Sequence, residues 1–178
     1  DEIVLPDKTD LDKLLIQTLD AGKDDSKKTL KLYSPVYFNT NPVLVTICGV
    51  CKNVGKHMVS AGSATIFGPN SSLNRAVRIW GNATNVRADI VALLLALQAA
   101  PRTKTLHIST RSEFAIKATK YYAFRNDACG WKGVNGDVLK LVIQMIQARS
   151  APVHFIHIKK SAIHGQYNEA KSMADKAA

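Results

Sequence analysis

The order of apolar segments along the chain is the feature that most restricts its fold. From Val43 onward, three strand-like segments follow one another: VLVTICGV, VSAGSATIFGPNSS and RAVRIWG. Helical and strand-like segments then alternate, as RADIVALLLALQAA, TLHIST, SEFAIKATKYYAF, VLKLVIQMIQA, VHFIHI and YNEAKSMADKAA. Three strands followed by this alternation predict an α/β fold, in which a mixed sheet carries helices on both faces.

Two of the predicted helices carry recognisable end signals. The helix that contains RADIVALLLALQAA stops before Pro101, because proline has no N–H to donate and clashes with the preceding turn. Ser112 is placed to cap the next helix, and we expect Phe114, Ala115 and Ala118 to face inward from it.

Residues 1–42 differ from the rest of the chain, and we interpret them as an N-terminal extension or linker that precedes a domain over residues 43–178. A short amphipathic helix is predicted there, because leucines recur at helical spacing at Leu11, Leu14, Leu15 and Leu19. This helix either packs on the domain or docks on a protein partner through residues 9–20.

Charge is distributed unevenly along the 178 residues. Eighteen of the 24 basic residues and six of the 14 acidic ones follow residue 43, so this part carries a net charge of +12, whereas the first 43 residues carry −2. A domain with three bases per acid attracts polyanions. The alternative is a basic surface that serves solubility alone. We favour a nucleic-acid-binding face, because no segment resembles an amphipathic membrane helix.

The sequence also indicates a compartment. The longest apolar run, IVALLLAL, is too short to cross a bilayer, and the N-terminus lacks the basic-then-apolar order of a signal peptide. Three cysteines are too few for a disulfide framework and fit a reducing environment. We therefore expect an intracellular protein that does not contact membranes, with the nucleus, cytoplasm and mitochondrion all open.

Several blocks resemble the eukaryotic type of the ribonuclease H type 1 family, in order and in spacing. They are TICGVC (46–51), AGSATIFGPNSSLN (61–74), TNVRAD (84–89), STRSEFAI (109–116), GWK (130–132) and HFIHIKK followed by NEA. The resemblance covers about residues 43–178. It implies a ribonuclease H-like fold, with a five-stranded mixed sheet flanked by helices on both faces.

Members of that family cut the RNA strand of RNA–DNA hybrids with four carboxylates that hold two Mg²⁺ ions. The resemblance places the first three carboxylate positions on Cys48, Asp89 and Arg111. A thiol is a soft ligand that suits Mg²⁺ poorly, and a guanidinium stays cationic in proteins. Only Asp89 keeps an acid, one methylene shorter than the family's glutamate.

The fourth carboxylate position has two candidates. Alignment on Asn168 and Glu169 places it on Ser172, whereas alignment on Ala174 and Asp175 places it on Asp175 at the cost of a three-residue insertion. With one retained acid, or two, a two-metal site is incomplete. We therefore expect no catalytic residues, no metal site, no cofactor, and Mg²⁺ binding that is lost or weak.

Arg111 allows two interpretations. It is either a neutral replacement in an abandoned site, paired with Asp89, or a substitute for the metal that donates to the phosphate which Mg²⁺ once held. The basic surroundings favour the second.

Binding of nucleic acid is the property that we expect to persist. The resemblance places Asn85 where the family contacts the hybrid in the minor groove, and places the two tryptophans of its DNA channel on Tyr122 and Asn126. Phe124 and Trp131 either stack on the ligand or pack in the core. The predicted nucleic-acid-binding residues are Asn85, Arg87, Arg111, Lys117, Lys120, Tyr122, Arg125 and Lys132.

Two other patterns carry weaker signals. Cys48 and Cys51 form a CxxC pair, but at a strand end rather than at a helix N-terminus, so redox chemistry is not expected. His154 and His157 are three apart on a predicted strand, hence on opposite faces, and we interpret both as structural.

Three functional hypotheses follow. The first is a catalytically inactive ribonuclease H-like domain that binds an RNA–DNA hybrid or double-stranded RNA through a basic face. The second is a pseudo-enzyme scaffold for protein interactions in a larger assembly. The third is a residual metal-dependent ribonuclease that acts on RNA–DNA hybrids.

Overall fold

A five-stranded mixed sheet forms the centre of the molecule. The computed structural model describes residues 32–33, 41–55, 58–79 and 81–178. The strands are β1 (Val43–Lys52), β2 (Ser60–Ile66), β3 (Arg75–Ile79), β4 (Leu106–Thr110) and β5 (Val153–His157). Their order in the sheet is β3-β2-β1-β4-β5; β1 to β3 pair antiparallel, and β4 and β5 join parallel to β1. The predicted fold class and the fold that the resemblance implies are both confirmed.

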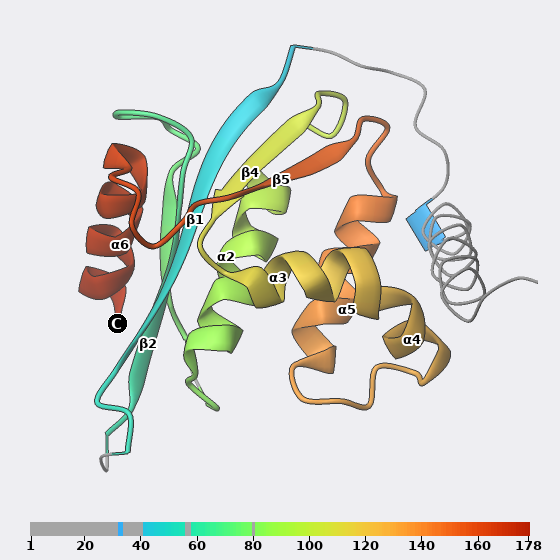
Figure 1. Cartoon of the computed structure of the whole chain (residues 1–178), viewed down its shortest axis with the longest axis horizontal. Coiled ribbons are helices and arrows are strands. Elements are labelled where there is room, and N and C mark those ends of the chain that lie inside the picture. Colours follow the sequence, from blue (N-terminus) through green and yellow to red (C-terminus); the bar gives the residue numbers. More distant parts are fainter. Residues whose placement is uncertain (1–31, 34–40, 56–57, 80) are drawn as a thin grey trace, which may run out of the picture.

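The helices cover both faces of this sheet (Figure 1). One face carries α2 (Asn85–Ala99) and, packed on it, α5 (Gly136–Gln147). The other face carries the C-terminal helix α6 (Gly165–Ala177), which lies along β1 and β2. Because β1 is covered on both sides, its residues Val45 to Cys48 are all buried, and the apolar run predicted this.

Two glycines let the helices approach the sheet closely. A Cβ added to Gly49 of β1 would meet the backbone of Ala88 and Asp89 in α2. A Cβ added to Gly62 of β2 would meet the carbonyl oxygen of Ala174 in α6. The absence of a side chain at these two positions therefore sets the distance of both helix layers from the sheet.

The helical region after β4 consists of three consecutive parts: α3 (Glu113–Lys117), a π-helical turn η1 (Ala118–Tyr122) and α4 (Ala123–Ala128). Ser112 caps α3 by accepting a hydrogen bond from the Ala115 backbone N–H at 3.2 Å, as predicted. Ala115 and Ala118 are buried, as expected, but the expectation for Phe114 is wrong, because 39% of it is exposed.

The end of α2 before Pro101 is confirmed. No helix within the described residues has both the length and the apolar character that a bilayer crossing needs. The amphipathic helix predicted around residues 9–20 lies outside the described residues.

Candidate functional site

The candidate site lies where β1, α2 and β4 meet. The structure places Cys48 in the middle of β1, not at the strand end that the sequence had suggested, Asp89 in the second turn of α2 and Arg111 directly after β4. The backbone N–H of Gly49 donates to Oδ1 of Asp89 at 2.9 Å, which ties the strand to the helix. The three positions that the sequence singled out therefore belong to one region.

Asp89 is a mostly buried acid whose pKa is raised to about 6. Burial is the main cause, because it disfavours the charged carboxylate. The Gly49 N–H and the side chain of Ser112 hydrogen-bond the carboxylate and partly oppose this shift. This acid thus titrates closer to neutral pH than an ordinary aspartate does.

Cys48 is buried on the face of the sheet that α6 covers, in a small cluster with Ile66 and Ala170. Burial raises the pKa of its thiol, while a hydrogen bond with the side chain of Tyr167 lowers it in part. The residue at the first carboxylate position is therefore a protonated, enclosed thiol that packs like a small apolar side chain.

Arg111 is held by α6 and the loop before it. Its guanidinium carbon lies 4.2 Å from the centre of the Tyr167 ring, and its Nη2 donates to the carbonyl oxygen of Ala162 at 2.9 Å. No ion pair joins Arg111 to an acid within the described residues. The interpretation in which Arg111 pairs with Asp89 is therefore wrong, because the guanidinium is directed toward Tyr167 instead.

Neither candidate for the fourth carboxylate position lies beside Cys48: Asp175 lies farther along β1, next to Lys52, and Ser172 faces solvent. Asp175 pairs with Lys52 at 3.3 Å, and Lys52 is four residues beyond Cys48 along β1, a run of about 13 Å. Ser172 is exposed on α6. The residue of α6 whose charge acts on the Cys48 thiol is Lys171.

Mg²⁺ does not fit this donor set. One carboxylate, a buried thiol and two cations replace the cluster of hard oxygen ligands that the ion needs. Within the described residues, no three His, Cys, Asp or Glu side chains come together as metal ligands. Around Cys48, two cations, Arg111 and Lys171, stand against one acid, Asp89.

The fold and the comparison with family models agree. The RNase H family model matches residues 44–178, which is most of the chain. The chain belongs to the RNase H family. No curated protein matches it in a sequence search. The suspected family is thereby confirmed, and the chain carries an RNase H domain.

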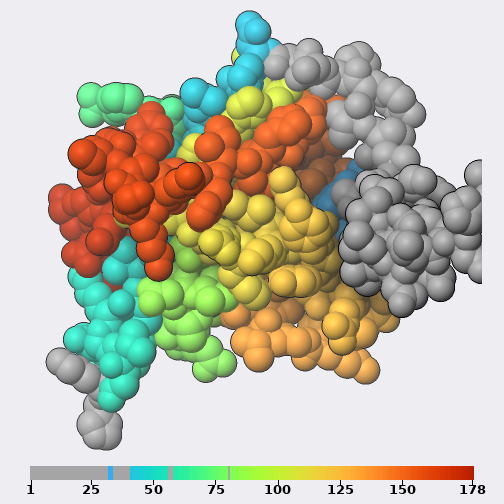
Figure 2. Space-filling model, viewed as in Figure 1, coloured from blue at the N-terminus to red at the C-terminus, as the bar shows by residue number. Residues whose placement is uncertain are grey.

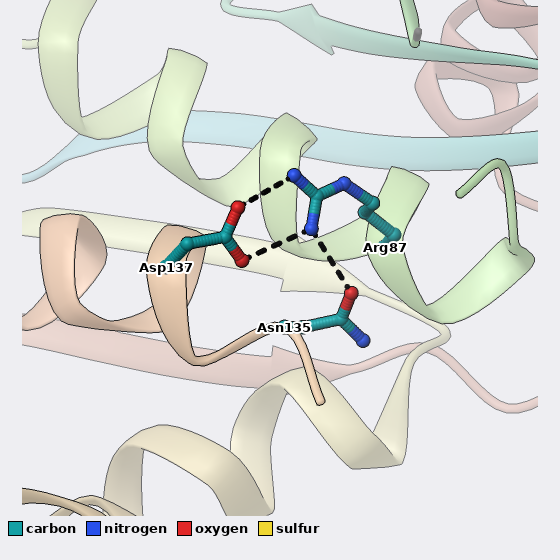
Figure 3. Close-up of polar contacts among 3 residues, drawn as sticks. All are labelled: Arg87, Asn135 and Asp137. Carbon is teal, nitrogen blue, oxygen red and sulfur yellow. Dashed lines mark hydrogen bonds and ion pairs between the residues drawn. The ribbon is translucent and has the colours of Figure 1, made fainter. Parts of the chain in front are cut away.

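Arg87 of the RNase H domain joins two helices (Figure 3). Its Nη1 and Nη2 donate to the Asp137 carboxylate at 3.0 and 2.7 Å, and Nη1 also approaches Oδ1 of Asn135 at 3.3 Å. This bidentate pair links the start of α2 to the start of α5. Much of the hydrogen-bonding capacity of Arg87, a predicted binding residue, is thus used within the protein.

An aromatic groove of about 420 Å³ runs beside α3 and α4. Tyr122 and Arg125, both predicted to bind nucleic acid, line it together. Phe114 and Trp131 also line it, and Asn126 completes the pair of positions that the resemblance matched to the DNA channel. We define the aromatic groove by Phe114, Tyr122, Arg125, Asn126 and Trp131.

The left-handed backbone of two residues shapes the wall of the aromatic groove. Trp131 and Asn135 have φ values of 59° and 62°. A side chain at Gly136 would collide with the carbonyl of Trp131, so the chain turns tightly here. The indole Nε1 of Trp131 donates to Asp127 at 3.1 Å, which fixes the ring at the rim.

A second groove, of about 490 Å³, borders the first turn of α3 at Glu113 and is mostly cationic. Arg111, Glu113, His157, Lys159 and Lys160 line it, and we call it the cationic groove. In the space-filling view, the segments that follow β4 (yellow) and β5 (orange-red) lie side by side (Figure 2).

The other predicted binding residues are spread around these grooves. Asn85 and Lys132 are exposed at the start of α2 and in the loop after α4. Lys117 is exposed and pairs with Glu113 at 3.2 Å. Lys120 lines a separate, mostly apolar pocket of about 220 Å³ with Tyr33.

The weaker sequence signals find structural explanations. Cys48 and Cys51 are both free thiols; Cys51 approaches the Ala83 carbonyl next to α2, whereas Cys48 faces α6. The CxxC pair therefore points to opposite faces of the sheet. His154 stacks edge-on against His107 of β4, with ring centres 5.2 Å apart.

Tyr167 and Lys171 are the site residues that sequence analysis missed. They are four residues apart and hence lie on the same side of α6. The buried Ala170 and Ala174 show which side of α6 faces the sheet, and this side is known only from the packing of the helix. The two residues that the resemblance proposed at the fourth carboxylate position, Ser172 and Asp175, are not the ones that act on Cys48.

Proposed function

We propose that this RNase H domain binds a nucleic-acid duplex, an RNA–DNA hybrid or double-stranded RNA, without cutting it. The observation that carries the proposal is the reversed charge of the site: Arg111 stands at one carboxylate position, and Lys171 acts on the Cys48 thiol at another. Two cations oppose the binding of Mg²⁺ and favour the approach of phosphate.

The aromatic groove supports the same proposal. Tyr122 is 46% exposed and Phe114 39% exposed, so both rings are accessible to a ligand. Arg125 lies in the same groove. Aromatic faces next to a guanidinium suit the sugars and bases of a nucleic-acid strand.

A salt titration of binding tests this function. We expect a labelled hybrid to bind at low salt, with an affinity that falls steeply as salt rises, because binding releases counterions from phosphates. Arg125→Glu is expected to weaken binding at least tenfold. Lys104→Glu, a reversal in the exposed loop before β4, is the matched control and should change little. Unmeasurable affinity for hybrid and for duplex RNA at low salt would refute the proposal.

A protein-interaction scaffold is the second candidate. Exposed apolar side chains between β1 and β2 favour it, since Val54 is 71% and Met58 78% exposed. Affinity for hybrid that survives charge reversal of both Arg111 and Lys117 would count against the first candidate.

A further inference from the structure

Resting on that proposed function, we propose that the cationic groove is a subsite for one backbone phosphate, held without a metal by Arg111 at its base and by Lys159 and Lys160 on its rim. The groove is distinct from the aromatic groove, because the two have no lining residue in common. Glu113 lines the former and Phe114 the latter.

The topology of the sheet brings the groove residues together. β4 and β5 are parallel neighbours, with Thr110 opposite His157 at their carboxyl ends. Arg111 directly follows the first strand, and Lys159 and Lys160 follow the second. Crevices outside the carboxyl ends of parallel strands are common ligand sites in α/β proteins.

Arg111 is held in place before any ligand binds. Stacking on Tyr167 and the hydrogen bond to the Ala162 carbonyl fix the plane of its guanidinium. A planar fork that is already ordered loses little entropy when it binds a phosphate. This distinguishes Arg111 from an ordinary flexible surface base.

The cations of the groove outweigh its acid. The acid, Glu113, is already paired with Lys117 at 3.2 Å. Within the described part of the chain, no ion pair engages Arg111, Lys159 or Lys160. Three cations face a cavity of about 490 Å³, which is large enough for a nucleotide unit.

Binding of a short RNA–DNA hybrid to the full chain, measured by fluorescence anisotropy between about 50 and 200 mM salt, tests the subsite. Removing one cation that touches a phosphate should reduce the salt slope by about 1 and weaken binding about tenfold at 0.1 M salt. We expect a slope reduction of about 1 for Arg111→Met and about 2 for Lys159→Met/Lys160→Met. Lys104→Met, at the opposite end of β4, is the control and should match the unmodified protein.

The same titration is run in EDTA and in MgCl₂ at equal ionic strength, and we expect equal affinities. Arg111→Met removes a stacking interaction and could unfold the protein. In that case the double lysine variant, whose side chains are exposed, provides the independent test.

The outcomes separate the two proposals. Binding by the unmodified protein with unchanged slopes in both variants overturns the subsite alone, as does affinity that requires Mg²⁺. Competition by polyglutamate as strong as that by hybrid of equal charge would show an unselective polyanion groove and would also overturn it. No binding by the unmodified protein overturns the proposed function and the subsite together.

Discussion

At the scale of single residues, the retained acid and the acquired cations have opposite consequences. Asp89 is a carboxylate that the fold buries, and no ion pair within the described residues engages it; its pKa is raised to about 6. Arg111 is a cation that the fold positions through Tyr167 and Ala162. Buried Asp89 lowers the stability of the fold at neutral pH, whereas Arg111 favours the binding of anions.

The pH dependence of stability follows from Asp89. Its pKa in the folded state lies above the usual 3.8, so the folded protein binds this proton more tightly than the unfolded chain does. The resulting stabilisation is complete below about pH 4 and is lost as the pH rises through about 6. Asn cannot ionise, so Asp89→Asn should not lose stability as the pH rises. Its free energy of unfolding at pH 7 should exceed that of the unmodified protein by about 1–3 kcal/mol.

Urea denaturation of both proteins at pH 4 and pH 7 measures this effect. Glu169→Gln, an exposed acid on α6, is the matched control, and its stability should follow that of the unmodified protein. An Asp89→Asn variant that is less stable at pH 7 would contradict the interpretation of Asp89 as a destabilising buried carboxylate.

At the scale of elements, glycines set how closely the helices approach the sheet, and one ion pair joins two of the helices to each other. Gly62→Ala should destabilise the fold by about 1–3 kcal/mol, because the new methyl group would collide with the Ala174 carbonyl of α6. Gly68→Ala meets no atom within 4 Å and should be close to neutral. Thermal unfolding compares the two variants, and equal midpoints would show that α6 is packed more loosely than described.

The Arg87–Asp137 pair joins α2 to α5, and a double-mutant cycle isolates its contribution. Because Asp137 is 65% exposed, we expect a coupling energy of about 0.5–1 kcal/mol between Arg87→Met and Asp137→Asn. Hybrid binding by Arg87→Met should stay within about twofold of the unmodified protein, since the guanidinium already serves Asp137. A loss of affinity far beyond twofold would show that Arg87 contacts the nucleic acid after all.

The order of elements was predictable because periodicity reports burial directly. The alternating RAVRIWG and the buried run around Val45 indicated strands, and the apolar helix before Pro101 ended where expected. The exposure of Phe114 was not predictable, because a helix pattern shows which side is apolar but not which neighbour leaves a groove beside it.

Only those site residues that lie within a family motif could be predicted from the sequence. Asp89 and Arg111 follow from such motifs. The side of α6 that faces Cys48 depends on how the helix packs over Gly62, a long-range interaction that no local pattern encodes. Lys171 was therefore missed, and of the two interpretations of Arg111, the disfavoured one, pairing with Asp89, does not hold.

At the scale of the whole molecule, the domain has the fold of the RNase H family, and near Cys48 two cations, Arg111 and Lys171, stand against one acid, Asp89. The residues after position 43 carry a net charge of +12. The aromatic and cationic grooves both border α3, through Phe114 and Glu113, and we propose that the first stacks on a strand while the second contacts its phosphates. Together these features predict a domain that holds a nucleic-acid strand and leaves it intact.

The most direct test is a cleavage assay on a labelled RNA–DNA hybrid with Mg²⁺ or Mn²⁺, run beside a binding curve on the same protein. We expect the hybrid to be bound at low salt and recovered uncut with either metal. Metal-dependent cleavage that Asp89→Asn abolishes, in a variant shown to be folded, would contradict the central claim.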